Sequence, residues 1–103
     1  MSKATGDTFI ELRLTRAYIR LFLVPVNEDG VRTVSLARFG NYEIRLVELS
    51  HAHANDLPPL WMELYAHNDQ ECIDSCACHE LEEAVRIAEQ LISQARELNE
   101  AKQ

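Results

Sequence analysis

The chain has little glycine, proline, cysteine and positive charge, and it has no long apolar run. Glycine and proline number three each in 103 residues, and 47% of the residues are hydrophobic, which excludes a disordered or low-complexity chain. The most apolar window, residues 18–26, contains Arg20 and is shorter than the roughly 20 residues that cross a bilayer. The first residues contain no apolar signal core. We therefore expect a soluble, cytoplasmic protein that does not bind membranes.

Positive charge is scarce and unevenly placed. Ten basic residues stand against 17 acidic ones, for a formal charge of −7. Duplex nucleic acid is bound through clustered Lys and Arg, so the composition argues against such a partner. Residues 1–46 hold seven basic and five acidic groups, whereas residues 47–103 hold three and twelve. This division indicates a mildly basic sheet beside an acidic helix.

The odd number of cysteines, three, predicts reduced thiols rather than disulfides. With His79, the residues Cys72, Cys76 and Cys78 form the densest group of metal-ligand types, and zinc binds Cys and His tetrahedrally. If residues 72–78 are extended, however, the sulfurs lie about 6–7 Å apart for every two residues and do not converge. We expect ordinary buried thiols and no cofactor, with a thiol or zinc protein as the alternative. A helix N-terminus beside His79 favours a lowered pKa at Cys78, against which nearby glutamates act.

No catalytic set is recognisable. The pair His51 and His53 lies on one side of an extended segment, and we expect solvated loop histidines there. The sequence has no Gly-rich phosphate loop, no nucleophile elbow and no paired carboxylates with a histidine base. An enzyme with its site at a dimer seam is a further alternative, for which the sequence names no residues.

An amphipathic helix is predicted from about His79 to Lys102. Its apolar residues recur at spacings of three, four and seven, which places them on one side of an α-helix. They are Leu81, Ala84, Val85, Ala88, Leu91, Ile92, Ala95 and Leu98. Acidic residues in the first turn complement the helix dipole. No other segment shows that period, so we expect a single helix.

The preceding residues are expected to form five or six strands, because apolar and polar residues alternate in short runs between turns. The expected strands cover residues 8–14, 17–26, 31–39, 42–49, 60–66 and 71–77. The first two could be one bent strand, since no Gly or Asn separates them. Turns are expected at 27–30, 40–41 and 67–70. The fold class is therefore α+β: an antiparallel, meander-like sheet with one long C-terminal helix across one face. We expect a disordered tail over residues 1–7 and a single domain over 8–103.

The last hairpin sets the predicted faces of the sheet. A four-residue turn at 67–70 places Tyr65 opposite Cys72 and Leu64 opposite Ile73. The side away from the helix then collects large apolar and aromatic groups that one helix cannot cover. The candidate residues for a ligand or dimer face are Tyr18, Arg20, Phe22, Trp61 and Tyr65. Leaving such groups in water is unusual for a monomer, so we expect a two-fold homodimer, with a protein partner or a small ligand as the other ways to cover this face.

Arginines share this expected face with acidic residues. Arg13, Arg20 and Arg45 could clamp an anionic ligand together with the aromatic rings. Acidic residues on the same face favour instead a ladder of cross-strand ion pairs; these residues are Glu11, Glu43, Glu63 and Asp74. We favour the ion-pair ladder. The sequence thus predicts a small, non-catalytic binding or accessory module, homodimeric through the aromatic sheet face.

Overall fold

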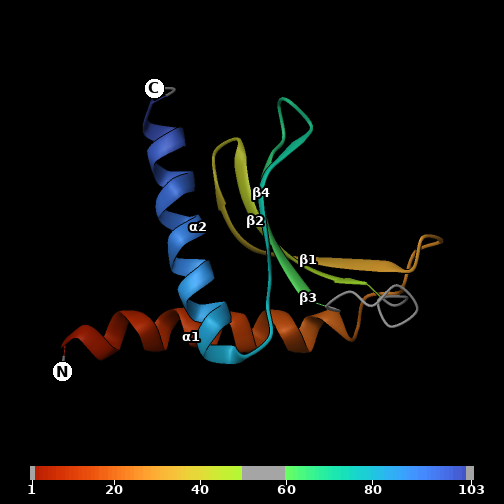
Figure 1. The fold of residues 1–103 in the computed structure, drawn as a ribbon, viewed down its shortest axis with the longest axis horizontal. Coiled ribbons are helices and arrows are strands. Elements are labelled where there is room, and N and C mark those ends of the chain that lie inside the picture. Colours follow the sequence, from red (N-terminus) through yellow and green to blue (C-terminus); the bar gives the residue numbers. More distant parts are fainter. Residues whose placement is uncertain (1, 50–59, 102–103) are drawn as a thin grey trace.

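The chain folds as two helices packed on one face of a four-stranded antiparallel sheet (Figure 1). The computed structural model describes residues 2–49 and 60–101. Helix α1 (Ser2–Leu21) comes first, and helix α2 (Leu81–Ala101) comes last. In Figure 1, α1 runs along the lower edge of the view and α2 rises from beside it, so the two helices lie crosswise. Neither helix is both long enough and apolar enough to cross a membrane.

The sheet is a meander with the strand order β1-β2-β3-β4. Its strands are β1 (Val31–Phe39), β2 (Tyr42–Leu49), β3 (Leu60–Ala66) and β4 (Glu71–Ala77), and all neighbours are antiparallel. These four strands and the C-terminal helix confirm the predicted α+β class.

The predicted turns are built from side-chain caps and a left-handed glycine. Ahead of β1, the Asn27 side-chain oxygen accepts hydrogen bonds from the backbone N–H groups of Asp29 and Val31, each at 2.9 Å. Between β1 and β2, Gly40 has a φ of 59°, and a side chain there would collide with Asn99 of α2.

The first two predicted strands are wrong, because residues 2–21 form one helix and the sheet has four strands instead of five or six. Residues 2–7, expected to form a tail, lie within α1. The inward side of α1 carries Ile10, Leu14, Ala17 and Leu21, whose spacings of four, three and four suit a helix. The side-chain hydroxyl of Thr15 donates to the carbonyl of Glu11 at 2.9 Å, the contact expected one helical turn apart.

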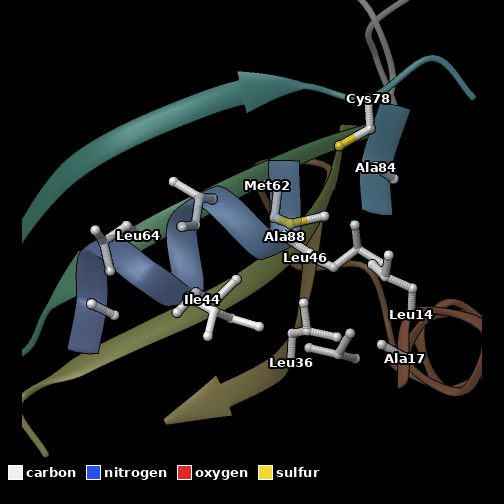
Figure 2. Close-up of a cluster of buried hydrophobic side chains, with 14 of the residues drawn as sticks. Leu14, Ala17, Leu36, Ile44, Leu46, Met62, Leu64, Cys78, Ala84 and Ala88 are labelled. Atoms are coloured by element: carbon white, nitrogen blue, oxygen red, sulfur yellow. The ribbon is translucent and has the colours of Figure 1, made fainter. Parts of the chain in front are cut away.

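A single hydrophobic core joins both helices to the sheet. Figure 2 shows side chains of α1, α2 and the strands pointing toward one another. The largest fully buried side chains are Leu21, Ile44, Met62, Leu64 and Leu91. Small residues of α2, among them Ala88 and Ala95, are fully buried, which lets the helix backbone lie close to the sheet.

A bulge in the last hairpin changes the predicted faces of β4. Tyr65 lies opposite Cys72, as predicted, but Leu64 lies opposite Asp74 rather than Ile73. The extra residue shifts the alternation, so that Cys76 comes opposite Met62 on the side of the helices. The predicted pairing of Leu64 with Ile73 is therefore wrong, and so is the predicted place of Asp74 on the side away from the helices.

Candidate functional site

A cavity opens between α1, the start of α2 and the sheet. Its volume is about 380 Å³. The residues that line it come from all three parts of the fold: Leu14, Thr15, Tyr18, Leu46, Leu60, Cys78, His79, Glu80, Leu81 and Ala84. Figure 2 shows Leu14, Leu46, Cys78 and Ala84 at one end of the hydrophobic core, where this cavity adjoins it. The cavity thus extends the core toward the surface.

The wall formed by residues 78–80 is anchored at both ends. The backbone N–H of Cys78 donates to the carbonyl of Leu60 at 2.9 Å, which continues the pairing of β3 with β4. The backbone N–H of His79 donates to the Glu83 carboxylate at 2.8 Å, so a side chain of the first turn of α2 caps its own helix. The first helical hydrogen bond, from Ala84 N–H to the carbonyl of Glu80, follows at 2.9 Å. These bonds fix the backbone of this wall.

Cys78 contributes a neutral thiol to the cavity. Its side chain is buried, and its sulfur lies 3.8 Å from the carbonyl oxygen of Cys76. Burial, together with the negative charge of Glu83 and the Cys76 sulfur, raises the pKa of the Cys78 thiol to about 11. The lowering expected from the helix N-terminus is therefore reversed. At neutral pH this group is protonated and behaves as a small apolar side chain with a weak donor.

The other predicted metal ligands point to different places. Cys72 is exposed and lies opposite Tyr65, whereas Cys76 lies on the other side of the sheet, opposite Met62. Partial desolvation raises the pKa of both thiols, helped by the charge of Glu63 at Cys72 and of Asp74 at Cys76. Within residues 2–49 and 60–101, no three His, Cys, Asp or Glu side chains form a group that could hold a metal ion. The pair His51 and His53 lies outside the described residues.

The five residues predicted for a ligand or dimer face fall on two separate surfaces. Tyr18 and Arg20 belong to α1, and Phe22 follows it, with the Tyr18 and Phe22 rings 4.9 Å apart in an edge-to-face contact. Trp61 and Tyr65 lie on β3, on the side of the sheet away from the helices. Of the five, Tyr18 alone lines the cavity, where it meets Cys78 and His79 from the predicted metal group.

The second face of the sheet, defined as the side away from the helices, is held by polar pairs. Arg45 donates to Glu63 at 2.8 Å, and its guanidinium carbon lies 4.0 Å from the centre of the Tyr65 ring. The cross-strand pairing of arginine with glutamate is thereby confirmed at this position. A hydrogen bond of 2.7 Å joins Glu43 to His67. Pairs within this face therefore neutralise the charges of Arg45 and Glu63 and give Glu43 a hydrogen-bond partner.

Glu43, on the second face, has a lowered pKa. Burial opposes ionisation of its carboxyl group, but hydrogen bonds from Ser35 and His67 and the charge of Arg45 outweigh that effect. Together they lower its pKa below the ordinary value of 4.5. The second face thus carries partnered polar groups beside the half-buried Trp61 and Tyr65.

Most large exposed apolar side chains lie instead on α1 and the turn after it. Of the nine among the described residues, seven belong to this part of the chain: Phe9, Leu12, Tyr18, Ile19, Phe22, Leu23 and Val26. The sequence reasoning missed this surface and the α1 side of the cavity, because both depend on residues 9–21 being helical. The recurrence of Ile10, Leu14, Ala17 and Leu21 is the signal that would have found them.

Comparison of the chain with models of protein families, with characterised proteins and with solved structures finds no significant match.

Proposed function

We propose that this protein is a non-catalytic binding module that takes a small, largely apolar molecule into the cavity between α1 and α2. The observation that supports this most is the cavity itself. Protein interiors are close-packed and leave few voids larger than a water molecule. A volume of about 380 Å³ lies near the lower end of the range for ligand sites, about 300–1,000 Å³. The cytoplasmic location expected from the sequence is part of this proposal.

The lining favours an amphiphilic ligand with a small polar end. Leu14, Leu46 and Leu60 offer neither donors nor acceptors, so the inner part of the cavity suits a ring or a short aliphatic chain. Tyr18 and His79, at the exposed mouth, supply polar atoms to which a single polar group could hydrogen-bond. This division matches small-molecule sites in general, which combine an apolar lining with a few polar groups.

The state of Cys78 supports binding rather than thiol chemistry. A nucleophilic or metal-binding cysteine acts as the thiolate, and a pKa of about 11 leaves almost none of that form at neutral pH. The thiol therefore adds apolar surface beside Ala84.

The test is a titration of isotope-labelled protein with indole and with octanoate, followed by amide NMR. We expect saturable shifts of the Thr15, Cys78 and Ala84 amides, which surround the cavity. Ala84→Leu fills part of the space and should weaken binding at least about tenfold, which corresponds to about 1.4 kcal/mol. Ala101→Leu adds the same atoms at an exposed site near the end of α2 and should leave binding unchanged.

Two results would overturn the proposal. One is the absence of any shift at these amides with either probe. The other is a folded Ala84→Leu protein that binds as tightly as the unaltered chain. If Ala84→Leu fails to fold, Thr15→Leu makes the same test at the exposed mouth of the cavity, where the added carbons need no repacking of the core.

A further inference from the structure

A second hollow lies between α1 and β1, an edge strand of the sheet. Its volume is about 680 Å³, and four of its lining residues are arginines: Arg13, Arg16, Arg20 and Arg38. These are half of the eight arginines of a chain whose net charge is −7. We call this hollow the arginine groove.

The positive charges of the arginine groove have no acidic partner among residues 9–49 and 60–101, whose side chains the structure describes. Arg20 donates to the carbonyl of Ser35 at 3.0 Å, and Arg38 donates to the carbonyl of Gly40 at 2.7 Å. The Arg13 guanidinium lies over the ring of Phe9, in the same helix. Arg16 makes no hydrogen bond or ion pair with any residue whose side chain the structure describes. The backbone contacts orient two of the guanidinium groups but leave the charge uncompensated.

Two of the other four arginines of the chain have acidic partners. Arg32 pairs with Glu48, and Arg45 pairs with Glu63, each across neighbouring strands. Arg86 and Arg96, on α2, likewise have no ion pair among the described residues, so what is particular to the arginine groove is that four arginines line one hollow. Like charges held together cost free energy unless a partner of opposite charge is supplied.

An apolar stripe runs along α1 beside the arginine groove. Phe9, Leu12, Ile19 and Leu23 follow spacings of three, seven and four, which place them on one side of the helix and its extension. Their exposed fractions are 59%, 47%, 58% and 79%. Arg16 falls in the gap of this stripe, so the apolar and basic groups form one continuous surface.

We propose that the arginine groove and this stripe bind an acidic segment of a partner protein that also carries apolar side chains. Arginine forks match carboxylates in a bidentate geometry, and the stripe would bury the apolar side chains of the same segment. This proposal goes beyond the cavity and does not depend on it.

Two other occupants fit the surface less well. A second copy would bring an identical α1, whose arginines would oppose these arginines, while α2 exposes Leu81 as its one large apolar side chain in the described residues. A lipid surface is flat and does not fill a hollow bounded by β1, and an anionic bilayer would repel a chain of charge −7. A narrow acidic segment carries the opposite charge and is slim enough to enter the hollow beside β1.

The test uses a fluorescein-labelled synthetic peptide rich in Glu and Leu, with binding followed by fluorescence anisotropy. Arg16→Glu and Arg38→Glu should each weaken binding at least about tenfold, because each replaces an attraction with a repulsion. Arg86→Glu makes the same charge change at an exposed position of α2 and should have little effect. Ile19→Ser should also weaken binding, because it removes an apolar side chain from the stripe. For the same reason, a matched peptide with Ser in place of Leu should bind less tightly to the unaltered protein.

Three outcomes would overturn the proposal. If Arg86→Glu weakens binding as much as Arg16→Glu, the effect is one of net charge and not of the arginine groove. If native mass spectrometry shows a dimer that Ile19→Ser converts to a monomer, a second copy covers the stripe. If the peptide fails to bind but phosphatidylserine vesicles bind in an Arg16-dependent way, the surface recognises lipid instead.

Discussion

The second face of the sheet and the outward surface of α1 both display arginines beside large side chains, but only on the second face does an arginine pair with an acidic side chain of the described residues. On the sheet, Arg45 is paired with Glu63 and lies over Tyr65. On α1, Arg16 has no acidic partner among the described residues and lies within an exposed apolar stripe. The comparison teaches that similar residue types serve stability where their partners lie in the same chain. Where the described residues include no such partner, the arginines are left for the binding that we propose.

The largest expected effect separates the two sides of α1 itself. Leu21 is fully buried, so Leu21→Ala should lower the free energy of unfolding by about 2–5 kcal/mol. Leu12 is 47% exposed, and Leu12→Ala should cost less than about 0.5 kcal/mol. Urea denaturation of the two variants measures the difference. Comparable losses would mean that the outward side of α1 is buried in solution, and the contrast between the two surfaces would fail.

A smaller effect should distinguish the arginines of the two surfaces. Arg45→Met removes the pair with Glu63 and the contact with the Tyr65 ring, and should cost about 1 kcal/mol. Arg16→Met keeps a comparable apolar stem and should change stability by less than about 0.5 kcal/mol, because it removes a charge that has no described partner. A double-mutant cycle of Arg45→Met with Glu63→Gln isolates the pair. A coupling energy of zero would show that Arg45 is no better partnered than Arg16.

The strands were predictable because local and tertiary signals agree in them. The sequence predicts β1, β2, β3 and β4 with the bounds that the structure has, since each begins or ends at a turn such as Asn27–Gly30 or His67–Gln70. The apolar period likewise locates α2 within two residues at each end. The bulge that moves Cys76 to the side of the helices has no comparable signal, because no turn residue marks it.

The first helix was missed because two periods coincide over its length. Ile10, Leu12 and Leu14 alternate like a strand, yet Ile10 and Leu14 also lie one helical turn apart. What decides between them is the continuation through Ala17 and Leu21, together with the lack of a turn residue at 15–16. Compared with the prediction, the sheet therefore has two strands fewer, and most exposed apolar side chains lie on α1 and the turn after it rather than on the second face.

The candidate site could be predicted only in fragments. Tyr18, Cys78 and His79 are all sequence candidates, the first for a ligand face and the others for metal binding. Their meeting in one cavity depends on how α1 crosses the start of α2, which no local pattern encodes. The arginine groove likewise joins Arg16 of α1 to Arg38 of β1, far apart in the sequence.

The smallest effect tests whether the second face stabilises the fold through charge. The pKa of Glu43 lies below 4.5 in the folded protein, because hydrogen bonds from Ser35 and His67 outweigh the cost of burial. A lowered pKa means that the folded state holds the proton less tightly than the unfolded state does. The stabilisation by Glu43 is therefore present above its unfolded pKa and is lost as the pH falls through the folded value.

Glu43→Gln should reduce the free energy of unfolding by less than about 1 kcal/mol at neutral pH and should flatten the decline of that free energy between about pH 5 and pH 3. Urea denaturation across this range measures the slope, with Glu28→Gln, in the exposed turn before β1, as the control that should keep it. Parallel curves for Glu43→Gln and the unaltered protein would show that the charge of Glu43 adds nothing to the fold, and the second face would then resemble the unpaired surface of α1.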